Sequence, residues 1–233
     1  MSSLIGQIRN NNDIIAKAEK VDDPDALESS ADILDEEEEQ QEEEEEEESE
    51  YETDIEADSE EDDTKFDPTG RTRYLIKCKE LGVVPNSSFL SNITSAICDL
   101  KHHSLGPKGS QAIARALIQN NYVTHLLMRD NAIQSEGSVY VTRLLRENFN
   151  ISEVDLSENE LGSVGAYTTA KLLRENNAIR VLSLGENSFK DKDATILAEA
   201  LKHNSALRDL DLSHNKFCEE AGLKFGKSTL VKM

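Results

Sequence analysis

The stretch "VDLSENEL" at residues 154–161 returns as "LDLSHNKF" at residues 210–217, 56 positions later. A related version, "VLSLGENSF", lies between them at residues 181–189, so the repeat period is 28 residues. Earlier versions are "LLMRDNAI" at residues 126–133 and "CDLKHHSL" at residues 98–105. The chain therefore contains five copies of one sequence unit.

One polar position keeps this period inside an otherwise apolar phrase. It is asparagine in four copies and histidine in the first: His103, Asn131, Asn159, Asn187 and Asn215. We expect each side chain to turn inward after its strand and to hydrogen-bond backbone groups that the strand-to-loop bend leaves without partners. These five residues are predicted to form a structural ladder.

Each unit combines two kinds of apolar pattern. A short LxL alternation predicts a strand with two inward side chains. The following stretch, such as "GAYTTAKLLRENN", has apolar residues at spacings of three and four, which predicts an amphipathic helix ending at the polar Asn pair. One unit cannot bury its apolar edge alone, so the units must stack. The predicted fold class is an α/β solenoid of about five 28-residue strand-turn-helix units.

These residues resemble a known family. The pattern LxxLxLxxNxL with a 28-residue period resembles the ribonuclease-inhibitor-like class of leucine-rich repeats over about residues 95–222. The segments "YLIKCKELGVVPNSSFL" (74–90) and "LKHHSLGPKGSQAIARAL" (100–117) look like the N-terminal segment and first repeat of the leucine-rich-repeat-containing protein 74 family. The resemblance implies a horseshoe whose strands line the inner face. It also implies an interaction scaffold without catalytic residues.

Charge divides the chain into different parts. The 233 residues carry a net charge of −22, but residues 1–70 hold 29 acidic and 4 basic side chains, whereas residues 71–233 hold 18 and 21. A block of like charge with few large apolar residues cannot offset its chain entropy, so residues 1–66 are predicted to be a disordered acidic arm. Residues 67–94 are predicted to form a helical cap that covers the first repeat, and residues 95–233 the repeat domain. Four apolar residues are expected on one face of the cap helix: Tyr74, Leu75, Cys78 and Leu81.

The last repeat departs from the pattern. Thr229 and Lys232 stand where the helix leucine and the helix-ending asparagine are expected, and Gly226 lies inside the helix position. The repeat is therefore predicted to be incomplete, with no polar capping repeat after it. Either the chain is a truncated or spliced form of a longer array, or a partner covers the end. The residues expected to be partly exposed are Leu210, Leu212, Phe217 and Leu223.

Motifs for catalysis or metal binding are weak. The stretch "AGLKFGKST" (221–229) lacks the first glycine of a phosphate-binding loop and does not follow a strand directly. His102 and His103 are adjacent, which does not suit a shared metal ion. No stretch reaches the roughly 18 apolar residues of a membrane span. We expect a non-enzymatic protein without cofactor, metal, membrane or direct nucleic-acid binding. The cysteines are expected to be small core residues in a reducing compartment: Cys78, Cys98 and Cys218.

The outward side chains of the strands remain as a candidate partner site. Concave faces of solenoids are the usual binding surface, and the alternative is a solvated face with ordinary charges. Basic residues are expected at its N-terminal end and acidic residues in its middle and C-terminal end. Two apolar residues, Leu127 and Val181, are expected to be exposed on it without a packing reason. The candidate partner-binding residues are Lys101, His125, Leu127, Arg129, Glu153, Asp155, Val181, Asp209 and Asp211.

The acidic arm has a solubilising and a functional interpretation. Its charge would attract basic proteins in a salt-sensitive way. Ser49, Thr53 and Ser59 each precede an acidic residue by three positions, which suits an acid-directed kinase. We expect a cytoplasmic protein, with the nucleus as an alternative, and a protein partner that the sequence does not identify. The alternative function is a regulator of a small GTPase, because Ran GTPase-activating proteins resemble this repeat class. Their acidic tract, however, follows an array about twice as long.

Overall fold

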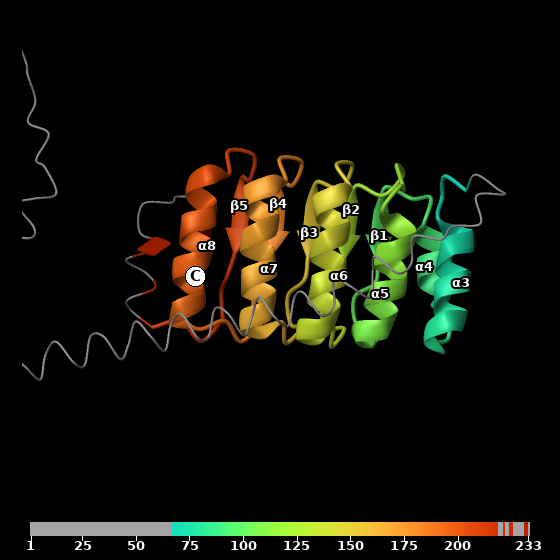
Figure 1. Ribbon diagram of the computed structural model, residues 1–233, viewed down its shortest axis with the longest axis horizontal. Helices are drawn as coiled ribbons and strands as arrows, with labels where there is room; N and C mark the ends of the chain where they lie inside the picture. Colours follow the sequence, from blue (N-terminus) through green and yellow to red (C-terminus); the bar gives the residue numbers. More distant parts are fainter. Residues whose placement is uncertain (1–66, 219–220, 222–223, 226–230, 233) are drawn as a thin grey trace, which may run out of the picture. The chain divides into compact units, whose positions relative to one another are not determined.

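The computed structural model describes residues 67–218, 221, 224–225 and 231–232. From α4 to β5 (residues 87–211), helices and strands alternate along the chain and form two neighbouring rows (Figure 1). The elements are α3 (Arg71–Leu81), α4 (Ser87–Asn92), β1 (Ile97–Asp99), α5 (Gly106–Leu117), β2 (His125–Leu127), α6 (Gln134–Glu147), β3 (Glu153–Asp155), α7 (Gly162–Glu175), β4 (Val181–Ser183), α8 (Asp191–His203), β5 (Asp209–Asp211) and β6 (Val231–Lys232).

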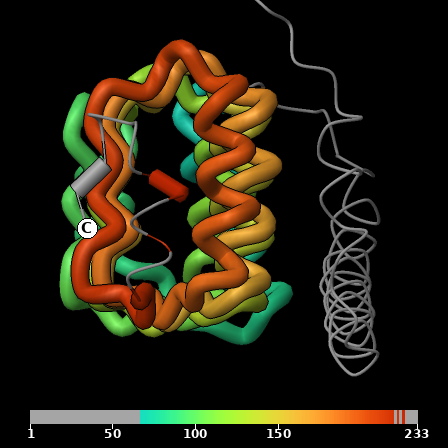
Figure 2. The backbone as a smooth tube through the Cα atoms, turned by 90° about the vertical axis from the view of Figure 1, so that its left-hand side faces the viewer, coloured from blue at the N-terminus to red at the C-terminus, as the bar shows by residue number. Residues whose placement is uncertain are grey.

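The strands form one parallel sheet in sequence order, from β1 to β6. Ile97 pairs with His125, and His125 pairs with Glu153, so the 28-residue sequence period is also the strand register. Viewed along the array, each repeat makes one coil, with its strand on one side and its helix on the other (Figure 2). The predicted α/β solenoid is confirmed.

The apolar columns of the repeat form one continuous core between the strands and the helices. The middle residue of every strand from β1 to β5 is buried, and its two neighbours are half-buried or exposed. Burying a leucine or valine side chain stabilises the fold by about 1.5–3 kcal/mol, so the repeated column supplies much of the folding energy. Cys98 lies in this column, and burial raises the pKa of its thiol to about 12.

The asparagine at the end of each strand links its own turn to the preceding repeat. The Asn159 amide nitrogen donates to the carbonyls of Met128, Leu156 and Ser157, all at 2.9 Å. Its side-chain oxygen accepts from the backbone N–H of Asn131 at 3.0 Å. Asn131, Asn187 and Asn215 make the corresponding contacts in their repeats. Each amide therefore satisfies backbone groups of two successive coils.

His103 occupies the first ladder position in a different way. Its ring nitrogens lie 2.6 Å from the carbonyl oxygen of Lys101 and 2.9 Å from the hydroxyl of Ser88. The ring is thus held between its own turn and helix α4, and the backbone N–H of His103 donates to Asn131. Histidine suits this position because the cap, not another repeat, precedes it.

A second set of asparagines lies where the helices end. The Asn148 side chain donates to the carbonyls of Leu117 and Asn120 at 2.7 and 2.9 Å. Its oxygen accepts from the N–H groups of Asn150 and Ile151. Asn176 and Asn204 repeat much of this arrangement. The sequence pattern indicates only a helix stop here, whereas the structure shows a second hydrogen-bonded ladder on the opposite side of the coil.

The turns around the first ladder contain residues in the left-handed region. The residue before each ladder position has a φ between 53° and 60°, as in Asp130 and Glu158. The first helical residue has a positive φ in three repeats, at Gly106, Gln134 and Gly162. The fourth repeat differs, because Lys190 has a φ of −107°. Only glycine adopts the left-handed region without steric cost, so Gln134 is strained relative to its two glycine counterparts.

Helix α3 follows a turn that the Asp67 carboxylate stabilises, and it ends at a glycine. Asp67 accepts from the N–H groups of Thr69, Gly70 and Thr72. Although its partial burial acts to raise the pKa, these bonds hold the Asp67 pKa down at about 2. Gly82 ends the helix with a φ of 67°.

The cap helix buries a different set of side chains from the one predicted. Tyr74 and Cys78 are buried, and the Tyr74 ring stacks edge-on against Phe89 with centroids 4.4 Å apart. The prediction for Leu75 is wrong, because this side chain is 40% exposed, whereas Lys77 is only 8% exposed. The helix is rotated so that positions 74, 77 and 78 face the array.

The C-terminal end is better covered than predicted. Leu210 and Leu212 are fully buried, and Ala221 and Phe225 belong to the same core. The prediction that both leucines are partly exposed is therefore wrong. Phe217 is half-buried with its ring centroid 6.0 Å from that of Phe225, and Leu223 lies outside the described residues. Cys218 is exposed, which corrects its assignment to the core.

A shortened return of the chain provides this cover. Val231 in β6 pairs with Leu210, only 21 positions earlier, instead of the usual 28. The last coil is thus compressed, and its strand adds to the edge of the sheet that would otherwise end at β5.

The ladder leads to the first prediction. Asn159→Ala should lower the free energy of unfolding by about 1–3 kcal/mol, because it leaves buried backbone groups without partners. Urea unfolding followed by circular dichroism measures the change. Asn150→Ala is the control, since this half-buried side chain makes one such bond, to Val123. Equal losses in the two variants would contradict a special role for the ladder.

The strained turn leads to the second prediction. Gln134→Gly should raise the free energy of unfolding by about 0.5–1 kcal/mol, because relief of the left-handed strain exceeds the entropy cost of glycine. Lys190→Gly is the matched control at the equivalent position, where φ is negative, and it should not stabilise the fold. Thermal melting of both variants measures the two effects. Stabilisation by Lys190→Gly but not by Gln134→Gly would contradict the conclusion that Gln134 is the strained residue.

Candidate protein-binding site

The sheet aligns the candidate residues in two columns. The first strand position gives Ile97, His125, Glu153, Val181 and Asp209, which are paired in register. The third gives Asp99, Leu127, Asp155, Ser183 and Asp211. Their side chains point away from the core, because the strand residue between them points into it. Seven of the nine candidate residues therefore lie side by side on one face of the sheet, which we call the strand face.

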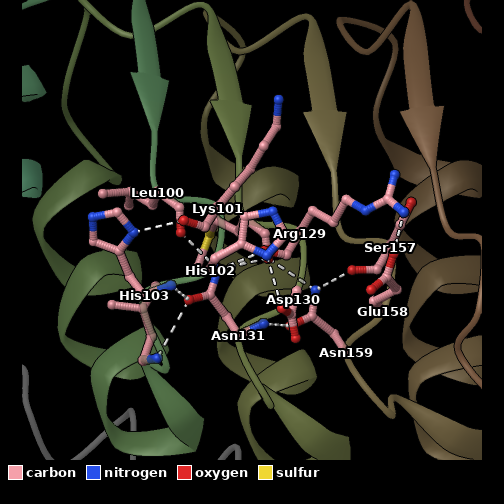
Figure 3. Close-up of polar contacts among 12 residues, drawn as sticks. Leu100, Lys101, His102, His103, Arg129, Asp130, Asn131, Ser157, Glu158 and Asn159 are labelled. Carbon is pink, nitrogen blue, oxygen red and sulfur yellow. Dashed lines mark hydrogen bonds and ion pairs between the residues drawn. The ribbon is translucent and has the colours of Figure 1, made fainter.

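The two remaining candidates, Lys101 and Arg129, lie in the turns just after β1 and β2. The guanidinium of Arg129 forms an ion pair with Glu158 of the next repeat (Figure 3). The hydrogen bond that the guanidinium donates to Glu158 raises the pKa of Arg129. The Lys101 ammonium lies 4.0 Å from a carboxylate oxygen of Asp99. Both cations thus have a carboxylate beside them, which reduces the basic character expected at the N-terminal end.

Histidines at this end also face carboxylates. His102 Nδ1 lies 2.7 Å from Asp130 Oδ2, and His125 Nε2 lies 3.3 Å from Glu153 Oε2 (Figure 3 shows the first pair). Both pairs bridge successive repeats. The adjacent rings of His102 and His103 contact different partners, so they do not converge on one point. Within the residues that the structure describes, no group of three or more His, Cys, Asp or Glu side chains could hold a metal ion.

Carboxylates dominate the strand face farther along the array. Those of Glu153 and Asp155 on β3 are separated by one strand from those of Asp209 and Asp211 on β5. Neighbouring strands are about 4.8 Å apart, so the two pairs stand about 10 Å apart. Val181 and Ser183 of β4 lie between them. We call the four carboxylates the acidic face.

Two members of the acidic face are held in place by their own turns. Asp155 Oδ1 accepts from the N–H of Ser157 at 3.1 Å, and Asp211 Oδ1 accepts from the N–H of Ser213 at 2.9 Å. Asp99 makes the same contact with Lys101 at 3.2 Å. These bonds orient each carboxylate relative to its own turn. An aspartate at this strand position therefore has a structural reason that the sequence pattern did not show.

The apolar candidates are less exposed than expected. Leu127 and Val181 are both half-buried between charged neighbours in their columns. Ile97 at the start of the first column is 53% exposed and was not among the candidates. The candidate phosphorylation sites Ser49, Thr53 and Ser59 lie outside the described residues. None of the helices in the described part is long and apolar enough to span a membrane.

A parallel strand and a helix in each 28-residue coil, joined through an asparagine turn, define a leucine-rich-repeat protein, and this chain is one. The family model described as Leucine Rich repeat matches residues 147–168 and 203–220. Arrays of this class are protein-interaction scaffolds.

The chain resembles known proteins. Leucine-rich repeat-containing protein 74B from Homo sapiens is 42% identical over 52 residues, which are 22% of this chain and 13% of that protein. The match thus spans only a small part of this relative. The solved structure of Leiomodin-1 Actin-Binding Site 2 (ABS2) superposes with a TM-score of 0.50 at 15% identity, covering 67% of this chain and 83% of that chain. This likeness shows the fold.

The inter-repeat ion pair leads to the third prediction. A double-mutant cycle with Arg129→Ala and Glu158→Ala should give a coupling free energy of about 0.2–1 kcal/mol, because both side chains are partly exposed to water. The coupling should shrink in concentrated salt, which screens exposed charges. Additive effects of the two changes at low salt would show that the pair contributes nothing to stability.

Proposed function

We propose that this protein is a non-enzymatic scaffold that binds a basic segment of a partner protein on its strand face. The acidic face carries this proposal, because four carboxylates stand in two in-register pairs on a rigid sheet. The expected ligand is a lysine- or arginine-rich segment of a protein. We place this function in the cytoplasm, with the nucleus as the alternative compartment.

The geometry suits a long cationic side chain. Its aliphatic stem would lie over Val181, while its charged end would meet the carboxylates on either side. Each exposed ion pair contributes only about 0.2–1 kcal/mol, so useful affinity requires several pairs along the array. A segment that crosses the strands would meet β3 and β5 in turn. The binding should therefore be strongly salt-dependent.

The acidic arm supports the same class of ligand. Residues 21–63 contain 26 acidic residues and no lysine or arginine, so the arm would raise the local concentration of basic proteins. We propose that the arm attracts such partners and that the strand face selects among them. Leiomodin-1 is described by an actin-binding site, but its 15% identity carries only the fold. We therefore do not propose actin as the partner.

The fourth prediction tests the strand face without the arm. In the chain from residue 64 onward, Asp209→Asn with Asp211→Asn should weaken binding of a synthetic oligolysine peptide by about 2- to 30-fold, from the loss of two ion pairs. Asparagine at position 211 retains the oxygen that accepts from Ser213. Isothermal titration calorimetry at low and high salt measures the change, and thermal melting confirms that the truncated chain is folded.

The matched control changes the charge by the same amount on the helical side. Glu136→Gln with Glu147→Gln alters two carboxylates of α6, away from the strands. This variant should bind the peptide as tightly as the parent chain. Equal weakening by both pairs of changes would mean that only the overall charge matters, and it would remove the acidic face as the site.

A further inference from the structure

A groove lies on the helical side of the array, between α3, α5 and α6. It is shallow and open to solvent, with a cavity volume of about 20 Å³. Three basic side chains line it, Lys77, Arg115 and Arg143, one from each helix. The apolar part of the lining comes from Ala114, Ile118 and Leu144. The groove thus combines apolar surface with a cationic rim, and no part of the strand face contributes to it.

The rim lies at the basic end of the array. Helices α3 and α5 together contain six lysines and arginines and a single acidic residue, Glu80, whereas α6 contains two of each and pairs Arg143 with Glu147 at 3.0 Å. Helices α7 and α8 together contain four basic and four acidic residues. Lys77 is 8% exposed, with its ammonium 3.4 Å from Glu80. A lysine so nearly buried makes this end of the helical side an environment that favours negative charge.

One segment of the chain has the complementary pattern. The stretch "ESEYETDIEAD" at residues 48–58 has an acidic residue at every even position. Its odd positions include Tyr51 and Ile55, which are the large apolar residues of this stretch. Residues four apart share one side of either an extended strand or a helix. In a strand the even-numbered carboxylates would face away from that side, but in a helix Glu48 and Asp54 lie beside Tyr51, and Glu52 and Asp58 beside Ile55, because residues three apart share a face. As a helix, the segment can therefore present its two large apolar side chains together, with carboxylates flanking them.

The position of this segment in the chain favours a contact within one molecule. Asp58 is 13 residues before Arg71, the first residue of α3. A linker of that length reaches at most about 43–47 Å, several times the 10–12 Å diameter of a helix. Because α3 itself forms one side of the groove, the segment is always nearby. Tethering over short flexible linkers gives effective concentrations in the millimolar range, so a weak intrinsic affinity is enough for binding.

We propose that residues 48–58 bind in this groove of their own chain, with Tyr51 and Ile55 on its apolar surface and the carboxylates beside Lys77, Arg115 and Arg143. The acidic arm then has an internal competitor for any basic partner. A basic protein that binds residues 48–58 must first displace them from the helices. The proposal concerns a surface opposite the acidic face and does not depend on what the strand face binds.

The absence of tryptophan from the chain permits a direct test. Tyr51→Trp in the full-length protein introduces a single fluorophore into the segment. We expect blue-shifted emission and protection from iodide quenching at low salt, and loss of both in Arg115→Glu with Arg143→Glu. Circular dichroism and thermal melting verify that the charge-reversed protein is folded.

A matched variant distinguishes the groove from general charge attraction. Lys171→Glu with Lys202→Glu makes the same charge change on α7 and α8, outside the groove, and should leave the emission and the quenching unchanged. Solvent-exposed emission in the parent protein, or equal loss in both charge-reversed variants, would overturn the proposal. A shift that grows with protein concentration would place the segment on a second molecule and would also overturn it.

Discussion

The fold depends on how the chain satisfies its backbone polar groups where each strand bends into its turn. An open bend inside a stack cannot reach water, so every unpaired N–H or carbonyl there would destabilise the protein. The Asn159 side chain meets this need. Its amide nitrogen donates to carbonyls of two successive coils, and its oxygen accepts from the backbone N–H of Asn131. The ladder therefore fixes the distance between repeats as well as the shape of each turn. The register of the sheet follows from that spacing.

Such a regular frame separates the two sides of the array chemically. On the strand side, every outward residue occurs at one of a few equivalent positions, so carboxylates such as Asp155 and Asp211 recur at corresponding points. On the helical side, α3 and α5 are strongly basic, whereas α7 and α8 together contain as many acidic as basic residues. A basic ligand and an acidic ligand would thus approach opposite sides of one rigid body.

Periodicity made the repeat, the strand register and the buried columns predictable, because five copies of the unit report the same environment. The predictions were wrong at the two ends of the array, where no other repeat provides a comparison. Leu75 is exposed and Lys77 is buried, and neither could be predicted because no other repeat contains a counterpart of the cap helix that would show its rotation. Leu210 is buried because the last coil closes after 21 residues, which no earlier repeat does. Ion pairs such as Arg129 with Glu158 join residues 29 positions apart, so one-repeat columns did not show them.

At the left-handed turn residues, the backbone conformation is constant while the side chain varies. His102, Asp130, Glu158, Glu186 and His214 share one backbone conformation while differing in charge and size. Branching at Cβ is excluded there by backbone sterics, yet almost any unbranched side chain can be presented in the same orientation. The row therefore offers five equivalent backbone positions, which carry histidine, aspartate or glutamate side chains. New specificity can thus arise by exchanging single side chains, with no need to rebuild the protein that carries them.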